Sequence, residues 1–363
     1  QVLQFFKSNK APGADRVPYE MFKNATIEFL NELSKTFNNI LETGIIDEEF
    51  LESIIFPIHK KEDLNDPNNY RGISFMNCSA KVLMGVIHAR LTNWIEKHNI
   101  LNEFQDGFRP QYSTVDNIYN LAAIVHLKFL EKKKIYAFFV DFKAAFDRVS
   151  RCSLIYKLPT LGISTKILNF IQNIYSNTKS AVWTGSELSD YFETYTGVKQ
   201  GCLLSPLIFT LYLNDLHEYL GGGLMVDEIN IRLLLYVDDI VLLTDDIVVM
   251  QEMVNNLERY CELWNMEVNM RKSEMMVFRK SGRLSVHEKI KYKQQYVNIV
   301  NEYCYLGVLL TPKMSFKKHL EKRNNSAKNS INATWSPFLI NPIYHLQING
   351  NFFNLYVDQY KRI

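Results

Sequence analysis

The sequence has little cysteine and no arrangement of cysteine that would define a fold. Its 363 residues include five cysteines. They are far apart and form no C-x-x-C pair, so neither a zinc knuckle nor a disulfide framework is indicated. A reducing compartment is the default expectation. No apolar run approaches the roughly 18–20 residues that cross a bilayer, and the start shows no signal peptide. We therefore expect no membrane association and no secretion.

Internal repeats and low-complexity tracts are also missing. Apolar residues make up 47% of the chain and charged residues 22%, which is ordinary globular usage and excludes disordered and collagen-like classes. The length allows two to three domains of ~100–200 residues each. Because the chain begins with glutamine and not methionine, we expect it to be part of a longer product.

Charge is balanced only in total. The formal net charge is +2, but residues 1–270 hold 25 Lys+Arg against 34 Asp+Glu, whereas residues 271–363 hold 16 against 5. An acidic body therefore precedes a basic C-terminal quarter. This asymmetry points weakly to a polyanionic partner. A solvated lysine-rich face explains the same numbers.

Hydrophobic spacing predicts a mixed fold. Apolar residues at helical spacing predict helices at 80–98, 115–129, 161–175, 206–216 and 250–264. Short apolar and β-branched runs predict strands at 54–58, 135–140, 232–237, 240–244, 275–278 and 303–310. Strand–helix alternation mixed with hairpins is typical of an α+β fold, and we expect one sheet covered by helices on one face.

Three aspartates lie at the ends of these strands. Asp141 follows the run 135–140, and Asp238-Asp239 lies between two apolar runs that together predict a β-hairpin. Aspartate supplies turn geometry, which is one explanation. The other is a cation site, because hard ions such as Mg²⁺ prefer oxygen ligands. Three carboxylates on adjacent strand ends could hold two metals ~3.5–4 Å apart for in-line displacement at phosphorus. The residues alone leave both open.

Eight blocks of the sequence, in this order, resemble one known family. They are Lys10–Asp15, Ile58–Lys61 with Asn69–Ser74, Gly107–Pro110 with Ser113-Thr114, Phe139–Asp147, Gly197–Pro206, Tyr236–Asp239, Asn269–Ser273 and Tyr305–Gly307. Together they resemble the reverse transcriptase domain of non-long-terminal-repeat retrotransposons, of the LINE type and similar to insect jockey elements. The resemblance covers residues 8–335.

The resemblance implies a right-hand polymerase with fingers, an antiparallel-sheet palm and a partial helical thumb. It assigns fingers to 1–134 and 152–195, the catalytic palm to 135–151 and 196–310, and the start of the thumb to 311–363. The thumb pattern fades after Trp335, so we expect a truncated thumb.

The resemblance also implies the chemistry. The expected activity is RNA-directed DNA synthesis, in which dNTPs are added to a primer 3′-hydroxyl by a two-metal mechanism. Asp141, Asp238 and Asp239 would bind two Mg²⁺ ions, with Mn²⁺ as a substitute. The implied partners are an RNA template, a DNA primer, dNTPs and other domains of the full element protein, such as an endonuclease. The implied locations are the nucleus for the reaction and the cytoplasm after synthesis.

Further roles follow by position. Lys60, Lys61 and Arg71 would contact the incoming triphosphate, which suits lysine as a point charge and arginine as a bidentate donor. Phe146 would be the aromatic steric gate that clashes with a 2′-hydroxyl. Without the resemblance, the three cations are equally well surface charges in a polar loop, and Phe146 is more simply a core residue of a helix.

Other matched positions concern the base pair, the leaving group and the primer. Gln200 and Gly201 would pack against the nascent base pair, although a glycine in a plain turn fits as well. Lys272 would protonate the pyrophosphate as a general acid, or would simply be solvated. Leu306 and Gly307 would belong to the hairpin that grips the primer.

Two rival functions and one departure accompany this hypothesis. A catalytically dead relic that only binds nucleic acid would use the basic segment 271–363. An RNA-dependent RNA polymerase is the other rival, and the aromatic Phe146 argues against it. The departure is Val237, where these elements usually carry alanine. We expect its extra methyl groups to lie beside the primer end.

Overall fold

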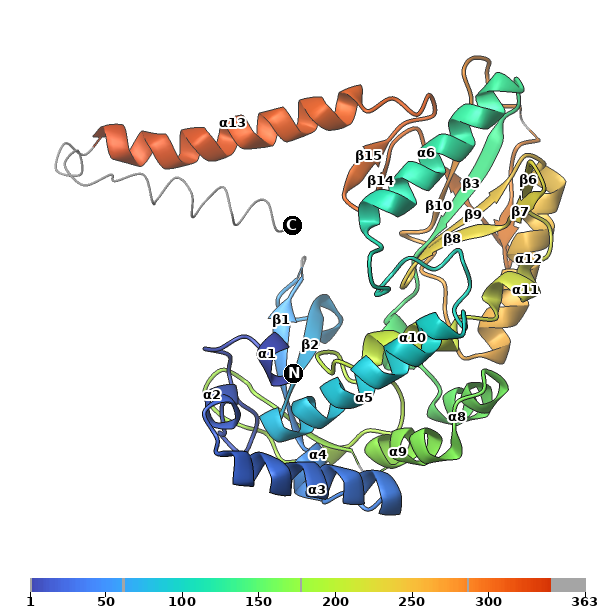
Figure 1. The fold of residues 1–363 in the computed structure, drawn as a ribbon. Coiled ribbons are helices and arrows are strands. Elements are labelled where there is room, and N and C mark those ends of the chain that lie inside the picture. Colours follow the sequence, from blue (N-terminus) through green and yellow to red (C-terminus); the bar gives the residue numbers. More distant parts are fainter. Residues whose placement is uncertain (1, 61–62, 177, 286, 341–363) are drawn as a thin grey trace.

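The computed structural model describes residues 2–60, 63–176, 178–285 and 287–340, and the chain forms an α+β protein (Figure 1). Its largest sheet has the strand order β13-β10-β3-β9-β8. The five strands are β3 (Ile135–Val140), β8 (Leu233–Tyr236), β9 (Asp239–Thr244), β10 (Glu274–Phe278) and β13 (Asn298–Ile299). Pairing is antiparallel except between β10 and β13, so the expectation of an antiparallel sheet holds for its four longest strands.

Strand β3 lies at the centre of this sheet, and all six of its residues are buried. Its β-branched and aromatic side chains suit a pleated surface. Tyr136, Phe138 and Val140 join the larger apolar core on one face. Ala137 and Phe139 join a second core on the other face. A strand that is apolar on both sides requires cover on both faces.

Helices cover both faces, which corrects the expectation of helices on one face only. The larger core includes buried residues of α10 (Ser205–Tyr212), α11 (Leu216–Leu220) and α12 (Ile247–Leu263). The second core is closed by α6 (Thr114–Leu130) and by the hairpin β14 (Tyr303–Tyr305)–β15 (Val308–Leu310). Helix α6 crosses in front of β3 and β10 in Figure 1.

A second sheet has the order β2-β1-β4-β5. Its strands are β1 (Ser53–His59), β2 (Tyr70–Met76), β4 (Lys179–Val182) and β5 (Phe192–Glu193). Strand β1 lies between β2 and β4, but β4 pairs only with Ser53, Ile54 and Ile55. Pro57 lies beyond that pairing, where its missing N–H costs no hydrogen bond to β4.

Other elements surround these sheets. They are α1 (Val2–Phe5), α2 (Tyr19–Lys23), α3 (Ile27–Thr43), α4 (Glu48–Leu51), η1 (Pro67–Asn69), α5 (Cys78–Lys97), α7 (Ala145–Arg148), α8 (Arg151–Thr160), α9 (Thr165–Ser176), β6 (Leu224–Val226), β7 (Ile229–Ile231), β11 (Lys291–Tyr292), β12 (Gln295–Tyr296) and α13 (Lys317–Ile340). Helix α13 extends away from the rest of the fold in Figure 1.

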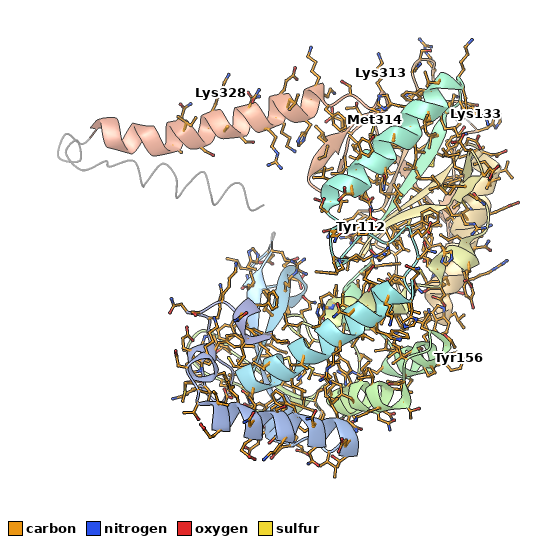
Figure 2. The ribbon with its side chains drawn as sticks, viewed as in Figure 1. Tyr112, Lys133, Tyr156, Lys313, Met314 and Lys328 are labelled. Atoms are coloured by element: carbon orange, nitrogen blue, oxygen red, sulfur yellow. The ribbon has the colours of Figure 1, made fainter. Side chains whose placement is uncertain are left out.

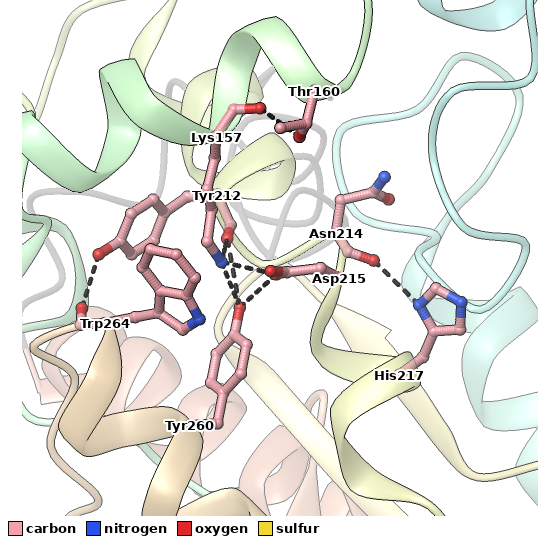
Figure 3. A network of polar contacts seen from close by, with 8 residues as sticks. All are labelled: Lys157, Thr160, Tyr212, Asn214, Asp215, His217, Tyr260 and Trp264. Atoms are coloured by element: carbon pink, nitrogen blue, oxygen red, sulfur yellow. Dashed lines mark hydrogen bonds and ion pairs between the residues drawn. The ribbon is translucent and has the colours of Figure 1, made fainter.

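The helix expected at 206–216 is two helices, because a buried lysine interrupts it. Lys157 Nζ donates to the Tyr212 carbonyl at 2.8 Å and to Asp215 Oδ1 at 2.6 Å. It also donates to the Tyr260 hydroxyl at 2.9 Å and lies 3.8 Å from the centre of the Trp264 ring (Figure 3). With the Tyr212 carbonyl used in this way, α10 ends and α11 begins four residues later. The cluster joins α8, α10 and α12.

Candidate active site

The register of β3 and β9 brings two of the predicted aspartates together. The last pair is Val140 with Ile240, so the next position outward on each strand is Asp141 and Asp239. Directly opposed residues of an antiparallel pair point to the same face of the sheet. This face also carries Phe139, against which the Tyr303 ring of β14 stacks with centroids 4.2 Å apart.

The third aspartate lies in the turn of the β8–β9 hairpin. Asp239 pairs with Tyr236, so the two turn residues are Val237 and Asp238, not Asp238 and Asp239 as predicted. The turn has an unusual conformation, because Val237 has φ +64°. That value is an outlier for a β-branched residue and needs support from its surroundings.

Gln105 provides this support. Its Oε1 accepts the Val237 N–H at 3.0 Å and the Gly107 N–H at 2.8 Å. The Val237 side chain is only 5% exposed and packs toward Gly107. Its methyl groups therefore face the protein interior beside Gly107, and the expectation that they lie beside the primer end stays a prediction.

Asp141 is oriented by the segment 269–273. Its N–H donates to Ser273 Oγ at 3.0 Å, and Asn269 Nδ2 donates to its Oδ2 at 3.1 Å. Lys272 Nζ lies 3.9 Å from the same carboxylate oxygen, on a side chain that is 69% exposed. The ammonium group is therefore close to the carboxylates and open to solvent.

Two of the three aspartates, Asp238 and Asp239, have raised pKa values. Incomplete solvation, reinforced by the charges of Asp238 and Asp141, raises the pKa of Asp239 to about 6. Burial also raises the pKa of Asp238, and Asp141 adds to this, whereas Arg71 and Lys272 oppose it. Like charges gathered in this way favour a cation, which would reverse these shifts.

The donor set fits a hard divalent cation only in part. Its oxygens are the ligands that Mg²⁺ prefers. Among the described residues, no group of three or more His, Cys, Asp or Glu side chains is arranged to hold a metal ion by itself. This suits an ion that completes its shell with substrate phosphate and water.

A second group of polar side chains surrounds Asp147. Gln200 Nε2 donates to both carboxylate oxygens of Asp147 at 2.9 Å. Burial raises the pKa of Asp147, whereas Gln200 and the positive charges of Lys60 and Arg71 oppose the rise. The positive charge of Arg71 therefore acts on both Asp147 and Asp238. Lys61 lies outside the described residues.

The loop that carries Gln200 is packed on β2. The Ser74 N–H donates to the Gln200 carbonyl at 2.7 Å. Gly201 has φ +110°, and a Cβ atom there would lie 2.6 Å from the Ser74 carbonyl oxygen. Glycine is therefore required by its own backbone conformation and by contact with a strand.

Phe146 and the β14–β15 hairpin complete the predicted set. The Phe146 ring stacks on Phe209 with centroids 4.8 Å apart and is half-buried. Leu306 and Gly307 form the two-residue turn of the hairpin, with φ of +46° and +82°, as a type I′ turn requires. The predicted single strand at 303–310 is thus a hairpin.

Two of the residues that orient this site were missed from the sequence. Gln105 lies two positions before a recognised glycine, and Asp147 ends a recognised block. No periodicity distinguishes either side chain, because each acts on a partner far away in the chain. Only their proximity to the matched blocks could have drawn attention to them.

Comparison with known proteins gives consistent relatives. Residues 58–310 match the family model described as reverse transcriptase (RNA-dependent DNA polymerase). The chain is 27% identical over 342 residues to the RNA-directed DNA polymerase from mobile element jockey of Drosophila funebris, covering 91% of this chain and 36% of that protein. It is 26% identical to the probable RNA-directed DNA polymerase from transposon BS of Drosophila melanogaster, covering 88% and 36%.

A solved structure shares the fold. Apo telomerase from Candida tropicalis, truncated from its C-terminal domain, aligns with a TM-score of 0.53 at 15% identity, over 85% of this chain and 62% of that one. The chain spans about a third of the length of the curated relatives it matches. No described helix combines the length and apolar character that crossing a membrane requires.

Proposed function

Because the chain belongs to the reverse transcriptase (RNA-dependent DNA polymerase) family, we propose that it extends a DNA primer on an RNA template as part of a non-long-terminal-repeat retrotransposon protein. One observation carries the proposal. Asp141 and Asp239 face each other across β3 and β9, with Asp238 in the adjoining turn. Their electrostatic coupling suits divalent cations bound beside a triphosphate.

The reaction forms a bond from the primer 3′-oxygen to the α-phosphorus of a dNTP and breaks the bond to pyrophosphate. We propose that Asp141, Asp238 and Asp239 hold two Mg²⁺ ions. These would neutralise charge on the transferred phosphate and assist loss of the 3′-hydroxyl proton. Asn269 and Ser273 hold Asp141 in place. Lys272, whose Nζ lies 3.9 Å from the Asp141 carboxylate, would give a proton to the leaving pyrophosphate.

We propose that the nucleotide lies between the β1–β2 hairpin and the carboxylates. Lys60 and Arg71 would bind its phosphates, and Arg71 already acts electrostatically on Asp238. The Gln200–Asp147 pair would border the base and sugar, and Phe146, fixed by Phe209, would exclude a 2′-hydroxyl. Leu306 and Gly307 would contact the primer.

The proposed subdivision follows these roles. Residues 1–134 and 152–195 would form the fingers, 135–151 and 196–310 the palm, and 311–363 the start of the thumb. Helix α13 would form most of the described part of that thumb.

Primer extension tests the function. The purified chain, an RNA template annealed to a DNA primer, dNTPs and Mg²⁺ should give template-directed extension, and EDTA should stop it. Replacing dNTPs with NTPs should give far less product. Extension with NTPs only would favour an RNA polymerase, and the absence of any incorporation would refute the proposal.

A binding-only function is the second candidate, because basic side chains are exposed on and near α13. They include Lys313, Lys317, Lys322, Arg323 and Lys328, and Lys328 projects outward from α13 in Figure 2. Phosphate neutralisation by such residues gives strongly salt-dependent binding. Duplex binding of this kind without incorporation by the wild-type chain would favour this candidate.

A further inference from the structure

A buried asparagine connects the catalytic hairpin to the β14–β15 hairpin. Asn117 lies on α6 and has no exposed surface. Its Nδ2 donates to the Leu235 carbonyl at 3.0 Å, and its Oδ1 accepts the Tyr305 hydroxyl at 2.8 Å. One side chain therefore uses both of its polar atoms to join two strands that do not pair with each other.

The two ends of this link are close to the residues proposed to act on the primer. Leu235 is two positions before Val237, the strained residue of the catalytic turn. Tyr305 is the last residue before the turn formed by Leu306 and Gly307. The link therefore ends one residue away from one turn and two residues away from the other.

The catalytic strand is held tightly at this point. The Leu235 N–H donates to the Phe104 carbonyl at 2.8 Å, and the Leu235 carbonyl also accepts the Asp106 N–H at 3.0 Å. The Tyr305 ring, only 3% exposed, lies 5.4 Å from that of Phe139. Both partners of Asn117 are thus buried and packed, so a change in either hydrogen bond must move one hairpin or leave a buried group unpaired.

We propose that Asn117 and Tyr305 are positioning residues that set the β14–β15 hairpin relative to the catalytic turn, and so place the primer 3′ end relative to Asp238. The inference rests on the proposed polymerase function. Neither residue contacts the reacting atoms, and each acts through the hairpin to which it is bound. A merely structural bond would affect stability alone.

The experiment compares the hydroxyl groups of two buried tyrosines, one on β14 and one on β3. Tyr305→Phe removes the bond to Asn117. Tyr136→Phe is the matched control, because the Tyr136 hydroxyl donates to Glu288 Oε1 at 3.0 Å from a side chain that is also buried. Tyr136 lies at the opposite end of β3 from Asp141, far from the catalytic turn. Both variants lose one hydrogen bond donated by a buried tyrosine hydroxyl, to an amide oxygen for Tyr305 and to a carboxylate for Tyr136.

Two readouts separate positioning from stability. The first is the rate of single-nucleotide incorporation by a preformed complex with RNA–DNA duplex. The second is the fluorescence of 2-aminopurine at the primer 3′ end without dNTP, which reports the environment of that end without turnover. Thermal unfolding and duplex affinity are measured beside them.

Tyr305→Phe should slow incorporation about five- to tenfold and shift the 2-aminopurine signal, with duplex affinity changed by no more than about twofold. Tyr136→Phe should lower thermal stability at least as much, because it loses a hydrogen bond to a carboxylate, but should leave the incorporation rate and the 2-aminopurine fluorescence unchanged. The double variant with Asn117→Leu and Tyr305→Phe should lose little more incorporation rate than either single variant, because each change breaks the same link between the hairpins.

Equal incorporation rates for the two tyrosine variants, or additive losses in the double variant, would overturn the proposal. The function is judged separately. If the wild-type chain incorporates nothing but its 2-aminopurine signal still depends on Tyr305, the polymerase function fails and the coupling stands. If binding of the wild-type chain does not change the 2-aminopurine signal of the free duplex, both the polymerase function and the coupling between the two hairpins fail.

Discussion

A Cβ atom at position 107 would lie 2.5 Å from Cγ2 of Val237 and 2.6 Å from its main-chain nitrogen. The loop before α6 and the catalytic turn are therefore in direct backbone contact. This contact, with the hydrogen bond from Val237 to Gln105, keeps a β-branched residue at φ +64°. The turn that presents Asp238 depends on a glycine 131 positions earlier in the chain.

Gly107→Ala should abolish or strongly reduce primer extension, because the new methyl group must displace the turn. The cost should exceed the roughly 1–3 kcal/mol of an ordinary overpacked site, since one of the atoms in contact is backbone. Adding Val237→Ala should restore activity only partly, because it removes Cγ2 but not the main-chain nitrogen. Extension assays and circular dichroism of all three chains test this. Full activity of Gly107→Ala would contradict the contact.

Asp238→Asn should abolish extension and leave duplex binding intact, because it removes a charged metal ligand without changing the size of the side chain. The loss should be at least about a thousandfold, the scale of a removed transition-state interaction. Asp227→Asn is the matched control. Asp227 is also an aspartate in a two-residue hairpin turn, between β6 and β7, and its substitution should be neutral. If both variants extend normally, Asp238 is only a turn residue.

Phe146→Ala should increase ribonucleotide incorporation relative to deoxyribonucleotide incorporation. The ring is held in one orientation by Phe209, and its removal leaves space for a 2′-hydroxyl. The ratio of kcat/KM for a dNTP and the matching NTP measures the effect, and we expect it to fall at least about tenfold, or ~1.4 kcal/mol. An unchanged ratio with lower stability would make Phe146 a core residue only.

Arg71→Ala should raise the KM for dNTP more than it lowers kcat, because a bidentate phosphate contact is lost. A charged hydrogen bond of about 1.5–3 kcal/mol corresponds to roughly ten- to a hundredfold. Arg71→Lys should recover part of the loss as a point charge. Arg90→Ala, at an exposed arginine of α5, serves as the control. Equal KM values for both alanine variants would exclude the phosphate role.

Lys157 should make stability depend on alkaline pH. Burial lowers its pKa from 10.5 to about 8, against the opposing pull of Asp215. Below pH 8 the Lys157 ammonium is charged in both the folded and the unfolded chain, and its burial in the folded chain lowers the free energy of unfolding. Between about pH 8 and 10.5 the unfolded chain binds more protons, so this cost disappears as pH rises.

Comparison with Lys157→Met isolates this effect. The free energy of unfolding of the wild type should rise across that window relative to the variant, by at most about 3 kcal/mol. Urea titrations at pH 7.5 and 10 measure the difference. Parallel pH profiles for the two chains would mean that Lys157 titrates normally.

The sequence predicted elements best where their pattern is purely local. Strand 135–140 was predicted residue for residue, because six successive β-forming side chains leave no other interpretation. The predicted helix 206–216 was wrong, because Lys157 on α8 takes the carbonyl at which α10 ends. Helical spacing continues through Leu216, so periodicity could not detect this interruption.

The aspartates show the same difference between local features, which the sequence reveals, and long-range contacts, which it does not. Their positions at strand ends were visible in the sequence, and the matched blocks identified the family. The register that opposes Asp141 to Asp239 was not, since strand pairing depends on contacts between distant segments. The predicted turn, Asp238-Asp239, lies one residue later than the observed turn, Val237-Asp238. The reason is also a distant contact, because Gln105, 132 residues away, holds Val237 in the turn.

By itself, the sequence determined the apolar strands, the carboxylates that follow them and the family to which the chain belongs. Hydrophobic pattern and residue order are local properties that can be seen in one chain. Only the tertiary structure decided how the site is held together. The Tyr305–Asn117 bond joins residues 188 positions apart, and a single buried hydrogen bond across such a distance has no periodic signature in the sequence.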